Sequence, residues 1–321
     1  MLIKVSEKES KKGKRGGVRV AGHEEETMAD FVLVSDVTAE ISQQNVEKYG
    51  MRIVPMTFFL GDKEYHQYPD NHELSMKEFY EGQVAGLETK SSQITPAEFT
   101  KVFEEVLKEG KDIIYYGLSS GLSGTYNSSV IAAEDLMDRY PDRKIKCVNP
   151  ICASVGEGYL FVMAAKKAME ENLGFDEVVS FLEDTQASIC HWFMVDNLEQ
   201  LRKGGRISAV SALVGSALNI CPILTTDREG ALRVATKIRG KKKAMSYLIE
   251  RIEEDGIRAK NDLIMVGHAN NMEAAEKLKS EILEKGLAKE VEIADIGPVI
   301  GSHVGSGMCA VLFVGENFKD I

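Results

Sequence analysis

The chain has 321 residues, of which 44% are hydrophobic and 28% are charged, so it is long enough to bury a sizeable core and to form two domains. A formal net charge of -11 argues against general affinity for nucleic acid or for an anionic membrane surface, because both need clustered lysine and arginine. No apolar run approaches the roughly 20 residues that cross a bilayer, and no segment resembles the apolar core of a signal peptide.

Residues 1–27 differ in composition from the rest of the chain. The segment 11–17 is basic and rich in glycine, the segment 23–26 is acidic, and neither has a periodic apolar pattern. We expect a disordered leader or an upstream extension here. Met28 is a candidate start of the folded protein.

Residues 28–173 are expected to form an N-terminal α/β domain. Short apolar runs alternate with amphipathic runs of helical length, which predicts a parallel sheet with helical crossovers. Thr95 and Pro96 are suited to the N-cap and the first turn of a helix, and Pro55 indicates an edge strand or a bulge. The expected strands cover 31–34, 52–60, 112–117 and 144–148, and the expected helices cover 39–49, 74–82, 97–110, 126–139 and 153–171.

Residues 174–321 are expected to form a mixed α/β C-terminal domain, because their pattern is less regular. Two runs that are separated by a short polar turn, 220–226 and 232–239, indicate a β-hairpin. We expect the last strands of this domain to pack near a ligand site. The other expected strands cover 188–195, 262–268, 290–293 and 309–314, and the expected helices cover 175–186, 209–219, 241–255 and 272–285.

Hydroxyl-rich loops follow the predicted strands of the N-terminal domain. Asp36, Ser119 and Ser120 come directly after strands, and in parallel sheets ligands collect at the carboxyl ends of strands. Ser91 and Ser92 come shortly before a predicted helix start. Serine hydroxyls and helix-start amides donate hydrogen bonds to a carboxylate or a phosphate. The loops therefore predict a site for one anionic head group.

The segment 295–308 has too many glycines for a regular element and is too apolar for a mobile linker. Its glycines are expected to serve close backbone approach or unusual dihedral angles. Its only histidine, His303, has glycines on both sides that leave room for a ligand. We expect the His303 imidazole to be a further hydrogen-bond donor to the head group.

A Ser-His-Asp esterase of the α/β class is the alternative function. Residues 117–121 match the pattern G-x-S-x-G after a strand, and His268 or His303 with Asp262 or Asp295 would keep the chain order of Ser, Asp and His. A nucleophile elbow, however, turns directly into its helix, whereas this loop continues for several residues. The sequence also has no HGGG-like oxyanion segment.

The sequence lacks the motifs that are typical of nucleotide-binding, metal-binding and disulfide-bonded proteins. The chain has no Walker loop, no G-x-G-x-x-G after the first strand, and no H-E-x-x-H motif. Its five cysteines have no CxxC spacing and mostly lie in apolar surroundings, which favours reduced thiols and a cytoplasmic location. We therefore expect no metal site and no cofactor.

Two short basic segments are candidate docking sites on an otherwise acidic protein. Residues 202–206 include Arg202 and Arg206, and residues 239–243 begin with Arg239. Such segments are commonly solvated surface, but they also suit an acidic partner surface.

Taken together, five motifs resemble those of the DegV family in order and spacing, and the resemblance runs from roughly residue 29 to residue 318. Proteins of this family are bacterial fatty-acid-binding proteins, and some act as the acyl-carrier subunit of fatty acid kinase. The motifs are S-D-V-T at 35–38, K-S-S-Q-I at 90–94, L-S-S-G-L-S-G-T at 118–125, L-R-K-G-G-R-I at 201–207 and I-G-P-V-I-G-S-H-V-G at 296–305.

The resemblance implies that one long-chain fatty acid lies in an apolar tunnel with its carboxylate near the surface. It also implies that the protein does no bond chemistry itself, and that a separate kinase subunit converts the carboxylate to an acyl phosphate for phospholipid synthesis. The carboxylate-binding residues implied by the family motifs are Ser91, Ser92, Ser119, Ser120 and His303. The residues expected to dock the kinase subunit are Arg202, Arg206 and Arg239.

Three positions depart from the family pattern. Ser91 stands where threonine is usual, which keeps the hydroxyl and loses a methyl group. Ile94 and Ser306 stand where proline is common. The absence of proline at residue 94 leaves the serine loop before it less rigid.

Overall fold

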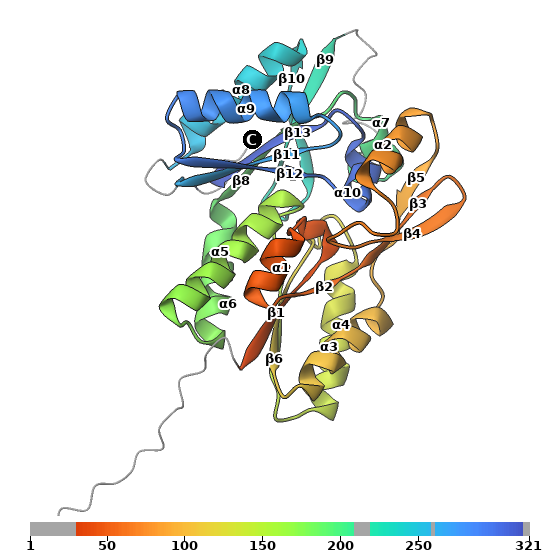
Figure 1. Cartoon of the computed structure of the whole chain (residues 1–321), viewed down its shortest axis with the longest axis vertical. Coiled ribbons are helices and arrows are strands. Elements are labelled where there is room, and N and C mark those ends of the chain that lie inside the picture. Colours follow the sequence, from red (N-terminus) through yellow and green to blue (C-terminus); the bar gives the residue numbers. More distant parts are fainter. Residues whose placement is uncertain (1–29, 209–218, 258–260, 317–321) are drawn as a thin grey trace, which may run out of the picture.

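The computed structural model describes residues 30–208, 219–257 and 261–316. Within these residues the chain is an α/β protein with a parallel four-stranded sheet, a mixed six-stranded sheet and an antiparallel three-stranded sheet (Figure 1). The expected fold class, a parallel sheet with helical crossovers followed by a mixed α/β part, is confirmed. The helix expected at 209–219 falls on residues 209–218, which lie outside the described residues.

The parallel sheet has two fully buried central strands, as expected for strands that are covered on both faces. Its strands, in pairing order, are β2 (Arg52–Val54), β1 (Phe31–Asp36), β6 (Asp112–Tyr116) and β7 (Ile145–Val148). The helices that accompany or follow them are η1 (Val37–Ala39), α1 (Gln43–Tyr49), α3 (Pro96–Lys108), α4 (Thr125–Arg139), α5 (Val155–Glu171), α6 (Phe175–Thr185) and η2 (Gln186–Ser188).

The N-terminus of α3 forms as the sequence predicts. The Thr95 hydroxyl accepts a hydrogen bond from Glu98 N at 3.3 Å, and the Glu98 carboxylate accepts one from Thr95 N at 2.7 Å. This capping box satisfies two backbone donors that a helix start leaves unpaired, and Pro96 has no such donor to satisfy. The serine loop before α3 is thereby fixed at its C-terminal end.

The segment 52–60, expected as one strand, forms two strands in different sheets because Pro55 interrupts it. β2 is an edge strand of the parallel sheet, in agreement with the expectation from Pro55. The second strand, β3 (Met56–Leu60), is the centre of the three-stranded sheet, between β4 (Lys63–Gln67) and β5 (Thr89–Ser91). The sequence pattern predicts neither β4 nor β5, because both are short and largely polar. Helix α2 (Met76–Val84) packs beside β3.

The mixed sheet contains the expected hairpin and has helices on both faces. Figure 1 shows α8 and α9 over one face, whereas α5 lies against the other. Side chains alternate along β13, so Val311 and Phe313 join the core under α8 and α9 while Ala310 and Leu312 face the opposite way. In pairing order the strands are β10 (Leu232–Arg239), β9 (Ile220–Thr226), β8 (Ile189–Met194), β13 (Cys309–Val314), β11 (Leu263–His268) and β12 (Glu290–Asp295). The helices are α7 (Glu199–Lys203), α8 (Lys241–Asp255), α9 (Met272–Glu284) and α10 (Pro298–Val304).

Helix α5 joins the parallel and the mixed sheet into one structure. One buried cluster contains Phe31 and Ile114 of the parallel sheet, Leu160 and Phe161 of α5, and Val314 of the mixed sheet. Tyr159 of α5 belongs to the same cluster, and its hydroxyl donates a hydrogen bond to Leu263 O of the mixed sheet at 2.7 Å. The division into domains at residue 173 stays a prediction.

The sequence analysis expected no regular element in the glycine-rich segment 295–308, and this was wrong for half of the segment. Residues Pro298–Val304 form α10, which begins with proline at a position where no backbone donor is needed. The glycines serve the two purposes that we expected. A Cβ at Gly301 would lie 2.5 Å from the Tyr80 hydroxyl oxygen, and Gly305 and Gly307 have φ angles of 78° and 96°.

In the part of the chain that the structure describes, no helix is both long and apolar enough to span a membrane.

Candidate functional site

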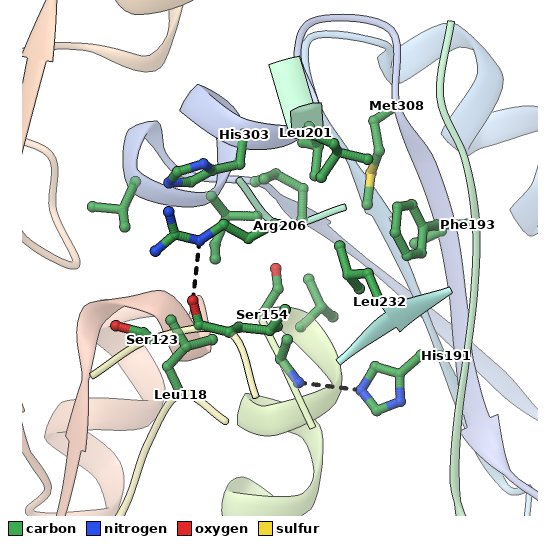
Figure 2. Close-up of a pocket in the computed structure, with 18 of the residues that line it drawn as sticks. Leu118, Ser123, Ser154, His191, Phe193, Leu201, Arg206, Leu232, His303 and Met308 are labelled. Atoms are coloured by element: carbon green, nitrogen blue, oxygen red, sulfur yellow. Dashed lines mark hydrogen bonds between the residues drawn. The ribbon is translucent and has the colours of Figure 1, made fainter. Parts of the chain in front are cut away.

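A largely apolar cavity of about 90 Å³ lies between the two larger sheets. Its apolar walls include Met56 of β3, Leu118 and Leu122 of the loop after β6, Phe193 of β8 and Leu312 of β13. Figure 2 shows Leu118, Phe193 and Leu232 among the side chains that surround the cavity. The polar residues that line it are Ser91, Gln93, Ser123, Ser154, His191, Arg206, Thr226 and His303.

At one end of the cavity Ser91, Arg206 and His303 form a polar cluster, which we call the head-group cluster. The Ser91 hydroxyl and His303 Nε2 are 2.9 Å apart and share a hydrogen bond. Figure 2 shows the His303 ring next to the Arg206 side chain. Among the described residues, nothing hydrogen-bonds to the buried His303 Nδ1. The glycine at residue 204 is needed here, since a Cβ would lie 2.2 Å from that nitrogen.

Burial lowers the pKa of His303 to about 4, and the charge of Arg206 adds to this effect. The imidazole is therefore neutral near neutral pH, with one N–H donor and one bare acceptor nitrogen. Which nitrogen carries the hydrogen depends on whether Ser91 donates or accepts. The only full positive charge in the head-group cluster is therefore that of Arg206.

Arg206 is half-buried and lines the cavity, although the sequence analysis assigned it to a docking surface. Its Nε donates to Leu122 O at 3.0 Å, and its Nη1 donates to Gly204 O. A guanidinium has five N–H donors, so two bonds to the protein leave others for an anionic group. The motif L-R-K-G-G-R-I contains this residue, but a basic run gives no signal that separates Arg206 from its exposed neighbour Arg202.

Of the other residues predicted to bind the head group, Ser92, Ser119 and Ser120 do not line the cavity. Ser92 is exposed. The Ser119 hydroxyl is buried and accepts from Gly121 N at 3.1 Å, and the exposed Ser120 hydroxyl accepts from Asn149 Nδ2 at 2.9 Å. Their role in binding stays a prediction.

The loop residue that does reach the cavity is Ser123, which the sequence analysis did not select. Its hydroxyl shares a hydrogen bond of 2.9 Å with the Thr125 hydroxyl at the start of α4. A turn through residues 119–123 separates Ser123 from Ser119, because Ser123 N donates to Ser119 O at 3.1 Å. The G-x-S-x-G match contains Ser119 and Ser120 but not Ser123. No motif in the sequence indicates that Ser123 lines a cavity.

The residues of the alternative esterase do not form a triad in the described structure. Ser119 donates to neither histidine: its oxygen accepts from Gly121 N, while His303 pairs with Ser91. His268 Nε2 does lie 3.3 Å from Asp295 Oδ1, but this pair is on β11 and β12, and neither residue lines the cavity. A nucleophile must share a hydrogen bond with its base for such chemistry.

Arg202 and Arg239, the two other residues predicted to dock a partner, are exposed on α7 and at the end of β10. Their function in docking stays a prediction. Among the described residues, no group of three or more His, Cys, Asp or Glu side chains is arranged to hold a metal ion.

The loop between β6 and α4 is held in place by the buried Asp36 carboxylate. Asp36 Oδ2 accepts hydrogen bonds from Tyr115 Oη at 2.8 Å and from Leu118 N at 3.0 Å, while Oδ1 accepts from Thr38 N at 3.0 Å and from the Thr38 hydroxyl. Gly117 allows this approach, because a Cβ there would lie 2.4 Å from Asp36 Oδ2. Asp36 therefore positions the loop that carries Leu118, Leu122 and Ser123.

Helix α10, which carries His303, is likewise held by side chains that the sequence analysis did not select. Gln83 of α2 donates to Gly301 O at 3.0 Å and accepts from Ser306 N at 2.9 Å. At the other end of α10, Gln67 of β4 accepts from Val299 N at 2.8 Å. Two glutamines that are far from His303 in sequence therefore fix both ends of its helix.

A second carboxyl group, that of Glu157, lies buried next to Asp36 and leads to a prediction about stability. Burial raises its pKa well above the usual range, and the charges of Asp36 and Glu40 add to this. The folded protein keeps a proton on Glu157 that the unfolded chain releases, so this stability is fully present below the unfolded pKa and is lost as pH rises toward the folded pKa.

Replacement of Glu157 by glutamine removes this titration. We expect the free energy of unfolding of Glu157→Gln, relative to the natural protein, to increase with pH by up to about 1.4 kcal/mol per unit above about pH 4.5. Urea unfolding of both proteins from about pH 5 to about pH 8 measures the difference. A constant difference across this range would contradict a protonated Glu157.

The fold and the cavity together define an α/β protein whose two larger sheets enclose an apolar space with a polar, cationic end. A family model described as "Uncharacterised protein, DegV family" matches residues 30–316. The chain belongs to the DegV family, and the resemblance seen in its motifs is thereby confirmed.

Relatives in sequence and in structure support this assignment along the whole match. A DegV domain-containing protein of Clostridium perfringens is 37% identical over 289 residues, which cover 90% of this chain and 99% of the relative. A DegV family protein of Thermus thermophilus, whose structure shows fatty acid binding, has a TM-score of 0.79 at 28% identity, with 89% of this chain and 99% of that one covered. DegV of Bacillus subtilis, a fatty acid binding protein, has a TM-score of 0.77 at 27% identity, with the same coverage.

Proposed function

We propose that this protein binds one long-chain fatty acid, with the acyl chain in the apolar cavity and the carboxylate at the head-group cluster. The observation that carries the proposal is that Ser91, Arg206 and His303 meet at one end of a cavity whose walls are otherwise mostly apolar. A carboxylate needs a positive charge and aligned N–H or O–H donors, and this cluster has both. The fatty acid binding of the Thermus thermophilus and Bacillus subtilis relatives supports the same ligand class.

The acyl chain supplies most of the affinity in this proposal. Burial of each methylene contributes about 0.8 kcal/mol as a gross transfer term, whereas the head group mainly fixes orientation. The cavity of about 90 Å³ is smaller than the roughly 300–1,000 Å³ of small-molecule sites, so its walls have to adjust. The unbranched side chains of Met56 and Met308 are suited to such rearrangement.

Presentation of the carboxylate to a kinase subunit is the second part of the proposal. Gln93 lines the cavity and is also exposed, so the head-group end is near the protein surface. The exposed Arg202 and Arg239 are candidate contacts for the kinase subunit, which would form an acyl phosphate. An assay with the kinase subunit should show less acyl phosphate from Arg202→Ala and Arg239→Ala, with fatty acid binding unchanged. Normal product formation in both variants would contradict these contacts.

The binding function is tested by titration of delipidated protein with hexadecanoic and octadecanoic acids. We expect one molecule of fatty acid per chain and no hydrolysis of short acyl esters. Turnover of esters that disappears in Ser119→Ala would favour the esterase instead. Failure of both fatty acids to bind would contradict the proposed function.

Replacement of His303 by alanine should weaken fatty acid binding by roughly 10- to 150-fold, since a hydrogen bond to a charged group contributes about 1.5–3 kcal/mol.

Ser120→Ala tests whether the serine predicted from the sequence or the residues that line the cavity bind the head group. Because Ser120 is exposed and bonded to Asn149, we expect its replacement to change the dissociation constant less than twofold. This corresponds to a change of roughly 0.4 kcal/mol at most in the binding free energy. Equal losses in both variants would restore Ser120 to the head-group site.

A further inference from the structure

Besides the head-group cluster, the cavity is lined by a second group of polar side chains, formed by Ser154, His191 and Thr226. In a cavity for a simple hydrocarbon chain these positions should be apolar. Two of the three side chains also lack hydrogen bonds. Among the described residues, nothing pairs with Ser154 Oγ or Thr226 Oγ1, and both oxygens are buried.

Ser154 is held in an unfavourable conformation. Its φ and ψ angles are 56° and -136°, which an L residue rarely adopts and which costs about 1–3 kcal/mol. It stands at the N-cap of α5, where a serine hydroxyl usually accepts a hydrogen bond from the helix, but no such bond forms here. The residue lines the cavity, and its hydroxyl oxygen is buried. The local structure of α5 therefore gives no reason for a serine in this conformation.

Thr226 and His191 line the cavity from neighbouring strands. Strands β8 and β9 pair Phe193 with Leu224, and alternation along each strand turns His191 and Thr226 to the same face of the sheet as this pair. Ala153 N, in the residue before Ser154, donates to His191 Nε2 at a long distance of 3.5 Å (Figure 2). Thr226 is only 3% exposed, so solvent does not satisfy its hydroxyl.

Both ring nitrogens of His191 have protein partners. Its Nδ1 lies 3.0 Å from Ile189 O, a carbonyl that only accepts, so Nδ1 carries the hydrogen and Nε2 is the acceptor. Burial lowers the pKa of His191 to about 4, so the ring stays neutral near neutral pH. The group thus offers two unpaired hydroxyls that both donate and accept, beside a neutral imidazole whose Nε2 already accepts from Ala153 N.

An unpaired buried hydroxyl costs about 1–3 kcal/mol, and a plain acyl chain would cover both hydroxyls without pairing either. We propose that Ser154, His191 and Thr226 form a second polar subsite that binds a hydroxyl group on the acyl chain, so that hydroxy fatty acids are preferred ligands. A ligand hydroxyl can donate to one of these groups and accept from another. This inference rests on the proposed function, because it assigns the ligand class of the same cavity.

The test compares octadecanoic acid with octadecanoic acids hydroxylated near the middle or at the far end of the chain, each titrated into delipidated protein. We expect at least one hydroxy acid to bind about tenfold tighter than octadecanoic acid, since a site built to bond a hydroxyl discriminates against the analogue without it. Hydroxy acids that all bind no tighter than octadecanoic acid would overturn the subsite. Failure of every acid to bind would overturn the proposed function itself.

Substitutions at Thr226 and Ser154 test whether these residues cause the preference for hydroxy acids. Thr226→Val and Ser154→Ala remove the hydroxyls at nearly constant shape, and we expect them to abolish the preference for the hydroxy acid over octadecanoic acid. Thr225→Val is the matched control, because alternation along β9 turns this neighbour to the other face and it does not line the cavity. A preference that survives in the variant with both Thr226→Val and Ser154→Ala would overturn the assignment of these residues.

Discussion

Replacement of Arg206 by glutamine should weaken fatty acid binding by about 30- to 1,000-fold. The reason is that its guanidinium supplies the only full positive charge in the head-group cluster, since His303 is neutral. Loss of the cationic partner from a partly buried charge pair costs about 2–4 kcal/mol. Titration of the delipidated variant with octadecanoic acid measures the effect.

Arg202→Gln is the matched control for Arg206→Gln. Both arginines belong to the segment 201–207, but Arg202 is exposed on α7 and does not line the cavity. We expect its dissociation constant for octadecanoic acid to stay within about twofold of the natural value. Natural affinity in Arg206→Gln would contradict the role of Arg206 in the head-group cluster. If that variant failed only in kinase coupling, the original assignment of Arg206 to docking would be supported.

Replacement of Asp36 by alanine should lower the free energy of unfolding by about 3–5 kcal/mol and also weaken fatty acid binding. Its carboxylate accepts hydrogen bonds from Thr38, Tyr115 and Leu118, and alanine would leave these buried donors unpaired at about 1–3 kcal/mol each. Binding should weaken because Leu118 begins the loop that forms one wall of the cavity. Urea unfolding and fatty acid titration measure the two effects.

Asp138, which is exposed on α4, is the control residue. Its replacement removes a carboxylate that does not hold the loop after β6. Asp138→Ala should change the free energy of unfolding by less than about 0.5 kcal/mol. The free energy of unfolding of Asp36→Asn should lie between those of the two alanine variants. The asparagine amide keeps one acceptor oxygen, but its NH2 group would face a hydrogen-bond donor of the protein. A fully stable Asp36→Ala variant would show that the buried carboxylate does not hold the loop.

Much of the fold is predictable because local patterns and tertiary structure agree. The capping box at Thr95, the hairpin of β9 and β10 and the alternation of buried strands with amphipathic helices all appear where the sequence places them. The pattern fails where a short or polar segment depends on its neighbours. β4 and β5 form because β3 lies between them, and α10 forms although it is flanked by glycines, because Gln67 and Gln83 hold its two ends.

The candidate site is predictable only in part, because loop geometry decides which side chains face the cavity. His303 and Ser91 stand out by their residue types and do meet there. The turn after β6 instead directs Ser123 to the cavity and Ser119 toward Gly121 and Gly230. Arg206 and the exposed Arg202 differ in burial, and a basic run in the sequence does not reveal which residue is buried.

The lipid that co-purifies with the protein tests the central claim most directly. Native mass spectrometry of protein purified from bacteria, followed by denaturing release and identification of the small molecule, measures both occupancy and chemistry. We expect one fatty acid per chain, and protein with the Arg206→Gln substitution should carry less of it. Empty natural protein that also fails to bind added octadecanoic acid would contradict a fatty-acid-binding function.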